Sequence, residues 1–140
     1  MAAVIRARAA DLASCAALYM RVGAAHFTWK PADAFKAADF AAIAAQEEIW
    51  VIHENDRVAA FLSYYVPGHF VHLLFVEQAS RGRGLGRALQ RHARCHYGAP
   101  HTLKVGVQNQ PARAFYGKLG YTEVEAGDSD GIAWLRLRSA

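Results

Sequence analysis

The chain has 140 residues, and 54% of them are apolar. This is enough to bury one hydrophobic core, and the sequence shows no linker, repeat or low-complexity segment, so we expect a single domain over residues 1–140. The formal charge of +4 favours an anionic ligand, which can be a nucleotide cofactor, a nucleic acid or an acidic protein surface. No apolar stretch is long enough to cross a bilayer, so a membrane-spanning protein is not expected.

The two cysteines, Cys15 and Cys95, lie in segments with helical spacing. Two isolated thiols indicate a reducing compartment rather than a disulfide scaffold, so we expect a cytoplasmic protein. The residues before Cys15 look like a lipoprotein cleavage box. Arg6, Arg8 and Asp11 interrupt the uncharged apolar run that such a signal needs, so lipidation is not expected.

The first half of the chain predicts, in order, a strand at 4–7, a helix at 11–25, a helical stretch at 32–46, and strands at 49–54, 58–66 and 69–76. Asp11 suits the first turn of the first helix, and apolar residues then recur at helical spacing. Asn55 and Asp56 favour a tight turn between two of the strands. The aromatic connection at 26–35 is a candidate wall for a ligand pocket.

The second half predicts a helix at 84–97, a strand at 102–107, a helix at 111–119, and strands at 121–126 and 132–137 around a turn at 127–131. Pro111 suits the first turn of its helix, and Gly120 suits the position after the helix end. The helix at 84–97 has apolar residues on one side and arginines on the other.

A glycine-rich basic loop connects the strand at 69–76 with the helix at 84–97. It consists of Arg81, Gly82, Arg83, Gly84, Leu85 and Gly86, followed by Arg87. Glycines let a ligand approach the backbone, and the first turn of a helix presents unpaired N–H groups and a positive dipole end. The arginines add charge where a pyrophosphate would lie, so the pattern predicts a phosphate-binding loop.

Other interpretations of this loop are weaker. A solvated basic surface would not need glycines between a strand and a helix. A dinucleotide-binding fold would place such a loop after the first strand of the domain, with an acidic residue about twenty positions later. A nucleic-acid module would interleave aromatic side chains with the arginines, so nucleic acid is not a favoured partner.

Two segments together resemble the GNAT superfamily of acyl-coenzyme A dependent N-acyltransferases. The first is the strand end 74–76 followed by Arg81-x-x-Gly84-x-Gly86. The second is Asn109-x-x-Ala112-x-x-Phe115-Tyr116-x-Lys118-x-Gly120-Tyr121. The resemblance implies an α/β (α+β) fold. Its sheet is mixed, mainly antiparallel and twisted, with six to seven strands, about four flanking helices and a splay between the fourth and fifth strands.

The resemblance also implies an acetyl-CoA site. The amides of Arg81 to Arg87 would hold the pyrophosphate, and the strand end at Phe75 and Val76 would hold the pantetheine arm. Asn109 would hold that arm or the amine, and Phe115 would pack near the cosubstrate. Tyr116 would protonate the leaving thiolate, although it can also be an ordinary core aromatic. Asn109 can equally be a helix cap.

An amine acceptor must lose a proton before it attacks. Strand alternation places His72 with Phe70, Leu74 and Val76, and His69 with Val71, Leu73 and Phe75. His72 is the first candidate for the base because imidazole titrates in the useful range. His69, Glu77 and a water chain stay open as alternatives.

We therefore predict transfer of an acetyl group from acetyl-CoA to a primary amine by direct attack in a ternary complex. The alternative is a non-catalytic module that binds acyl-CoA or nucleic acid. The acceptor can be a small molecule, an amino-acid-like compound or a protein amine; a polycation is not favoured because acidic residues are few. No metal is expected, since His92 and His96 lack further ligands. A homodimer is left open.

Overall fold

The computed structural model describes residues 3–26 and 32–140. Trp29 and the rest of 27–31, part of the aromatic connection expected to wall a pocket, lie outside the described residues. The strands are β1 (Val4–Arg6), β2 (Glu48–Glu54), β3 (Arg57–Tyr65), β4 (Phe70–Val76), β5 (Thr102–Gly106), β6 (Thr122–Ser129) and β7 (Ile132–Arg138). The helices are α1 (Ala9–His26), α2 (Ala37–Gln46), α3 (Leu85–Tyr97) and α4 (Gln110–Lys118), with short 3₁₀ turns η1 (Ala32–Ala34), η2 (Val66–Gly68) and η3 (Gln78–Ser80).

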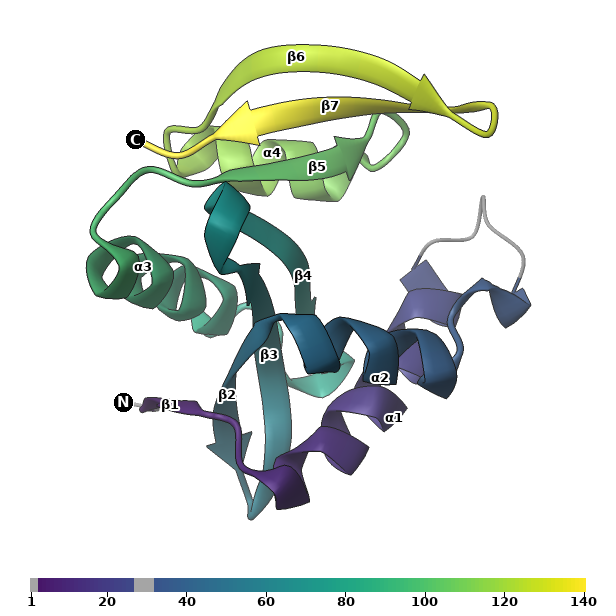
Figure 1. The fold of residues 1–140 in the computed structure, drawn as a ribbon, viewed down its shortest axis with the longest axis vertical. Coiled ribbons are helices and arrows are strands. Elements are labelled where there is room, and N and C mark those ends of the chain that lie inside the picture. The colour runs from purple at the N-terminus through teal and green to yellow at the C-terminus, as the bar shows by residue number, and fades with distance from the viewer. Residues whose placement is uncertain (1–2, 27–31) are drawn as a thin grey trace.

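The seven described strands form one sheet in the order β1-β2-β3-β4-β5-β7-β6. All neighbours are antiparallel except β4 and β5, which run parallel and pair only at Phe70 and Thr102. The Thr102 N–H donates to the His69 carbonyl at 3.0 Å, and beyond this point the two strands separate. Figure 1 shows the two halves of the sheet diverging from there. The predicted fold class and its splay between the fourth and fifth strands are confirmed.

Each face of the sheet has its own core. On one face α1 and α2 pack on Phe61 and Phe75, whose rings stack with centroids 5.5 Å apart. On the other face α3 and α4 pack through Leu89 and Tyr116 on apolar side chains of β3, β4 and β5. Burying each such side chain stabilises the fold by about 1.5–3 kcal/mol, so the two helical layers hold the halves of the sheet in place around the split.

Helix termini follow the sequence signals. Asp11 lies in the first turn of α1 and accepts a hydrogen bond from the Arg8 N–H at 2.9 Å, which satisfies one of the unpaired donors. Asn109 caps α4, and its Oδ1 accepts from the Ala112 N–H at 3.3 Å. The β2–β3 turn uses Asn55 and Asp56, both at positive φ, as their residue types predict.

Two predicted boundaries are wrong. The stretch at 32–46 is not one helix: η1 ends at Ala34, and α2 starts at Ala37. The turn predicted at 127–131 is only Asp130 and Gly131, because β6 continues through Gly127 to Ser129. The strand position of Gly127 requires glycine because the Trp134 ring covers it, and an added Cβ would clash with that ring.

The predicted faces of β4 also need correction. Ser63 pairs with Leu73 and Tyr64 with Val71, so His72 is the extra residue of a β-bulge. The bulge resets the alternation: Val71 belongs to the core under α3 and α4 together with Leu74, while Leu73 packs against the opposite core. The buried Ser63 hydroxyl supports the bulge by accepting from the Leu73 N–H at 2.9 Å.

Candidate active site

The loop between β4 and α3 has the conformation of an anion cradle. Gly82 and Gly84 adopt φ values of 79° and 81°, and an added Cβ at either position would meet no atom within 4 Å. This backbone needs glycine for its left-handed φ, and its outer side is open. Gly84 precedes α3 without a capping side chain, so the first-turn amides of α3 face outward unpaired.

The three arginines of the loop differ in their contacts. Arg83 Nη2 lies 2.7 Å from Glu54 Oε1, which also accepts from the Ser80 hydroxyl at 2.7 Å. Arg81 Nη2 donates to the Val76 carbonyl at 3.5 Å, and partial burial lowers the pKa of its guanidinium. Arg87 is exposed and forms no ion pair with another described residue. The loop is thus anchored to β2 and β4 through two arginines and presents the third to solvent.

Gly86 has a different role from the other loop glycines. An added Cβ would lie 3.2 Å from Phe115 Cζ, so this position lets α4 approach the start of α3. Phe115 is half-buried and packs against the core under α3 and α4. Leu85 is buried in the same core. Its side chain therefore anchors the helix, and only its amide is available to a ligand.

The split exposes backbone groups of β4. The Glu77 N–H donates to the Ala59 carbonyl at 2.7 Å and therefore points toward β3. Because backbone direction alternates along a strand, the amides of Leu74 and Val76 point the other way, toward the split, where β5 has moved away. The Phe75 amide faces β3, and Phe75 is one of the residues that line the cleft. The sequence drew attention to Phe75 and Val76 but missed the Leu74 amide.

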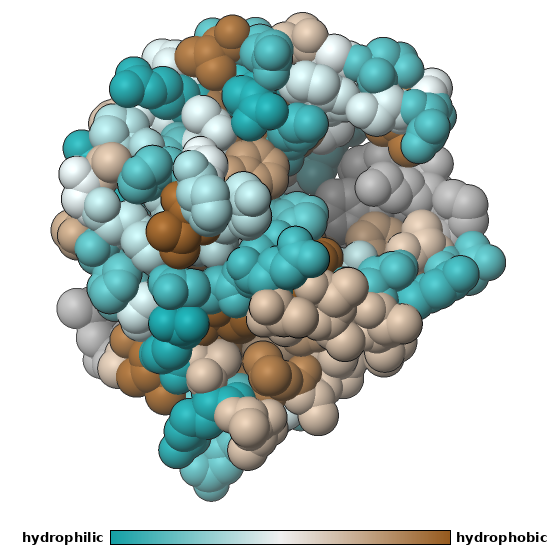
Figure 2. All heavy atoms as spheres, in the orientation of Figure 1, coloured by the Kyte–Doolittle hydropathy of each residue, from teal (hydrophilic) through white to brown (hydrophobic). Residues whose placement is uncertain are grey.

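A cleft of about 480 Å³ occupies the split. Its walls are β4 and β5, with Asn109, Ala112 and Tyr116 on one face of the sheet and Tyr19, Phe35 and Ile43 on the other. Residues of the β6–β7 hairpin complete it. The cleft thus passes through the sheet and connects its two faces. Figure 2 shows the surface hollowed between the part formed by β6 and β7 and the part formed by α1 and α2.

Tyr116 lies where α4 borders the cleft. Its side chain is 7% exposed, packs between Phe115 and Tyr121, and makes no hydrogen bond with any described residue. The hydroxyl oxygen nevertheless keeps some contact with solvent, because it is not one of the fully buried polar atoms that lack a hydrogen-bond partner. Burial raises the pKa of Tyr116, so the phenol keeps its proton at neutral pH and can donate it.

His72 borders the cleft on the opposite face, and its side chain is 41% exposed. Its Nδ1 lies 2.7 Å from Oε2 of Glu47, whose carboxylate follows α2 and is 8% exposed. The carboxylate fixes a proton on Nδ1 and leaves Nε2 as the acceptor. This pair was not predicted from the sequence, because no spacing rule links Glu47 to a residue 25 positions away.

The other two candidates for the base do not line the cleft. His69 precedes β4, adopts φ 45°, and its Nδ1 lies 3.0 Å from the Tyr64 hydroxyl. Glu77 follows β4 and forms an ion pair with Arg21. Both side chains are engaged elsewhere, so His72 is the candidate of the three that borders the cleft.

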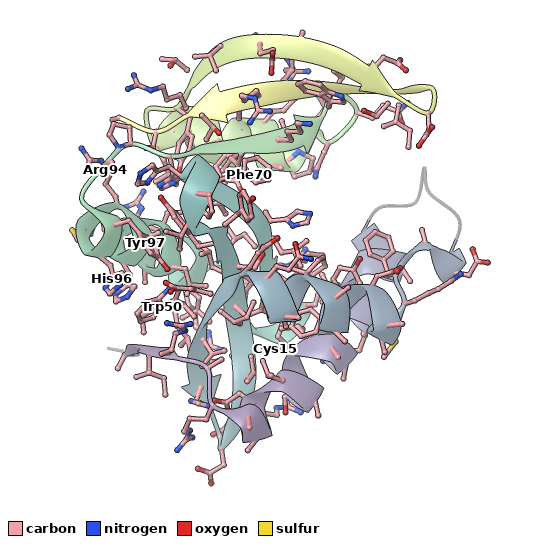
Figure 3. All side chains as sticks on the ribbon, in the orientation of Figure 1. Cys15, Trp50, Phe70, Arg94, His96 and Tyr97 are labelled. Atoms are coloured by element: carbon pink, nitrogen blue, oxygen red, sulfur yellow. The ribbon has the colours of Figure 1, made fainter. Side chains whose placement is uncertain are left out.

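Asn109 is a helix cap that also borders the cleft. It caps α4 through Oδ1 and also lines the cleft, where its amide nitrogen makes no hydrogen bond with another described residue. No group of three or more His, Cys, Asp or Glu among the described residues is placed to hold a metal ion. His92 and His96 instead pack against Trp50, next to Tyr97 (Figure 3).

Comparison with known proteins agrees with this geometry. Residues 45–123 match the family model of the acetyltransferase (GNAT) domain. The chain is 32% identical over 87 residues to the peptidyl-lysine N-acetyltransferase YiaC of Escherichia coli K12; the match covers 61% of this chain and 58% of YiaC. It is 33% identical over 112 residues to the 5-NmdU N-acetyltransferase of Pseudomonas phage PaMx11, covering 70% of this chain and 74% of that protein.

A solved structure extends the likeness to the whole described fold. The apo form of YjaB from Escherichia coli aligns with a TM-score of 0.82 at 24% identity, over 99% of this chain and 97% of that chain. Among the described residues, no helix is long and apolar enough to span a membrane. With more than half of its length matching the family model, the chain belongs to the GNAT acetyltransferase family.

Proposed function

We propose that the chain transfers an acetyl group from acetyl-CoA to a primary amine by direct attack. The observation that carries this proposal is a single cleft with a buried, protonated tyrosine hydroxyl on one face and a carboxylate-bound histidine on the other. YiaC, named as a peptidyl-lysine N-acetyltransferase, supports an amine acceptor. The chain spans only 58% of YiaC in that match, so the acceptor of YiaC is not carried over.

The residues present suit acetyl-CoA. The open loop with Gly82 and Gly84 would take the pyrophosphate on the first-turn amides of α3, and the exposed Arg87, which forms no ion pair with another described residue, would add positive charge. The acyl arm would lie in the split, where the amides of Leu74 and Val76 have no strand partner. One of these amides would hydrogen-bond the thioester carbonyl oxygen, which becomes more negative as the amine attacks.

His72 and Tyr116 would carry out the two proton transfers of the reaction. The ammonium form of the acceptor gives one proton to Nε2 of His72, and the neutral nitrogen forms a bond to the thioester carbon. The carbon–sulfur bond breaks, and the Tyr116 hydroxyl gives its proton to the thiolate. The acylated nitrogen releases its second proton to solvent, and solvent returns a proton to the Tyr116 phenolate. Protonated His72 then gives its proton to solvent, which is the net proton that the reaction releases. Neither Cys15, which is buried, nor Cys95, which lies on α3, borders the cleft, so no acyl-cysteine step is included.

The cytoplasmic location and the homodimer stay predictions. The two free cysteines support the first, since oxidising compartments favour disulfides.

The proposal is tested by measuring thiol release from acetyl-CoA in the presence of a panel of primary amines, with the acetylated amine identified by mass spectrometry. We expect amine-dependent release. A parallel titration with coenzyme A and with a short DNA duplex separates the alternatives. Binding of coenzyme A without release with any amine would favour a non-catalytic module, and binding of the duplex alone would reject the proposal.

A further inference from the structure

Lys104 is a cation in the cleft that the proposed reaction does not use. It lies on β5 between Leu103 and Val105, whose side chains are buried in the core under α3 and α4. Alternation therefore directs Lys104 to the opposite face of the sheet, the face that His72 borders. The side chain is exposed, lines the cleft, and forms no ion pair with any described residue.

Lys104 and His72 both line the cleft, close to the point where the two parallel strands separate. Phe70 and Thr102 are the single paired position of the parallel strands, and His72 and Lys104 each lie two residues further along. Directly adjacent strands lie about 5 Å apart, and the split widens this spacing. Figure 3 labels Phe70 at this junction of the two halves of the sheet. One small acceptor molecule can therefore place its amine nitrogen next to His72 and a second functional group next to Lys104.

The neighbours hold Lys104 without neutralising it. Its Nζ lies 4.1 Å from the ring centroid of Trp134, and the indole N–H donates to the Ser129 hydroxyl at 3.0 Å. Arg136, the cross-strand partner of Lys104 on β7, is engaged by Glu125, at 2.8 Å from its Nε. The ring orients the ammonium and leaves its charge for a ligand.

The acidic residues nearby do not remove this charge. Glu47 is bound to His72, across the split from Lys104. Asp130 also lines the cleft, in the β6–β7 turn, and forms no ion pair with Lys104. One side of the split therefore carries the His72 imidazole of β4, bound to the Glu47 carboxylate. The other side carries the Lys104 ammonium of β5, which has no ion-pair partner among the described residues.

We propose that the acceptor is an amine with a carboxylate or phosphate group a few bonds away, and that Lys104 binds this anionic group while His72 faces the amine. This inference rests on the proposed acetyl transfer. A charge-assisted contact on this side would position the amine at the split. The same charge would repel an acceptor with a second ammonium group, such as a diamine.

The test compares kcat/KM for matched amines. β-Alanine carries a carboxylate, O-phosphoethanolamine a phosphate, propylamine no second charge, and putrescine a second ammonium. We expect the wild type to prefer one or both anionic amines over propylamine by about tenfold or more, with putrescine last. Comparing the first two compounds distinguishes carboxylate from phosphate.

Lys104→Met should remove the preference by lowering kcat/KM for the anionic amines about tenfold while changing propylamine less than about twofold. Lys104→Arg should keep the preference. Arg91→Met, at an exposed position in the middle of α3, is the control because it removes one positive charge outside the cleft. It should leave all four values unchanged.

Equal kcat/KM for charged and neutral amines in the wild type, or an equal loss for all amines in Lys104→Met, would overturn the inference while leaving acetyl transfer intact. Failure to acetylate any amine would instead reject the proposed function. If Lys104→Met does not fold, the wild type still decides: propionate or methyl phosphate should inhibit propylamine acetylation competitively, and propionamide should not. Equal effects of these compounds would contradict the role of Lys104.

Discussion

Glu47 holds His72 at the split of the sheet, with Oε2 of the carboxylate 2.7 Å from Nδ1 of the imidazole. The two residues come from different elements, because Glu47 follows α2 and His72 is the bulged residue of β4. The bulge brings the imidazole to the face that carries Glu47. The pair has the arrangement of a base and the group that orients it.

Changing Glu47→Gln tests this pair. The amide keeps the size of the side chain but no longer fixes the proton on Nδ1, so Nε2 is less often the acceptor. We expect kcat for the amine to fall about tenfold or more, with an unchanged Kd for acetyl-CoA. The measurement is steady-state kinetics at saturating acetyl-CoA.

The matched control is Glu48→Gln at the adjacent residue, which does not line the cleft. The Glu48 carboxylate accepts a hydrogen bond of 2.6 Å from the Tyr97 hydroxyl. It should keep the wild-type kcat. Equal turnover in wild type and Glu47→Gln would mean that the contact is structural and that water serves as the base.

Tyr116→Phe removes the proposed proton donor while keeping the ring. Because the ring is buried between Phe115 and Tyr121, the fold should be retained. We expect kcat to fall about 10²-fold, with the Kd for acetyl-CoA within about twofold of wild type. Tyr65→Phe removes an exposed hydroxyl at the end of β3 and should leave kcat unchanged. A wild-type kcat in Tyr116→Phe would show that solvent protonates the thiolate.

Gly84→Asp tests the cradle through the affinity for coenzyme A. The substitution places a carboxylate on the open side of the loop, where it repels the pyrophosphate. We expect Kd to rise more than about tenfold by isothermal titration calorimetry.

Gly98→Asp is the control for backbone strain. Gly98 follows the other end of α3, has φ 69°, and an added Cβ there also meets nothing within 4 Å. Both variants should lose about 1–2 kcal/mol of stability, because a side chain disfavours positive φ. Only Gly84→Asp should lose coenzyme A. Equal Kd values for the two variants would place the pyrophosphate elsewhere.

The burial of His101 predicts that the free energy of unfolding decreases at acidic pH. It is 1% exposed, and its Nε2 lies 2.8 Å from Gln90 Oε1 and 2.6 Å from the Tyr121 hydroxyl. Burial, with nearby Arg94 and His69, lowers its pKa to about 4. Between about pH 6.5 and about pH 4 the unfolded chain therefore binds more protons at this site than the folded chain, so stability falls as the pH falls.

Thermal unfolding across this pH range measures the effect. His101→Gln should flatten the dependence of the melting temperature on pH, although its melting temperature at pH 7 should be lower because the hydrogen bonds change. His96→Gln, an exposed position on α3, should keep the wild-type slope. A His101→Gln variant with the wild-type slope would assign the acid sensitivity to other groups.

The element order was predictable because local signals mark it. Gly84 and Gly98 flank α3, Pro111 opens α4, and the Asn55-Asp56 pair turns the chain. The loop and Tyr116 were predicted from two separate motifs, 81–86 and 109–121, each of which consists of residues close together in sequence. These features depend on neighbouring residues, which a single sequence displays.

The remaining features depend on contacts between distant segments. The bulge at His72 is stabilised by Ser63 of the neighbouring strand, and the sequence pattern predicted regular alternation there. The ion pair of Arg83 with Glu54 and the contact of Lys104 with Trp134 likewise join separate elements. Residue spacing along the chain does not encode such pairs.

The position of coenzyme A in a crystal structure of its complex with this protein tests the proposed site. We expect the pyrophosphate on the amides at the start of α3 and the thiol in the split, between the Tyr116 hydroxyl and the amides of Leu74 and Val76. A pyrophosphate bound away from this loop, or a thiol directed out of the cleft, would contradict it.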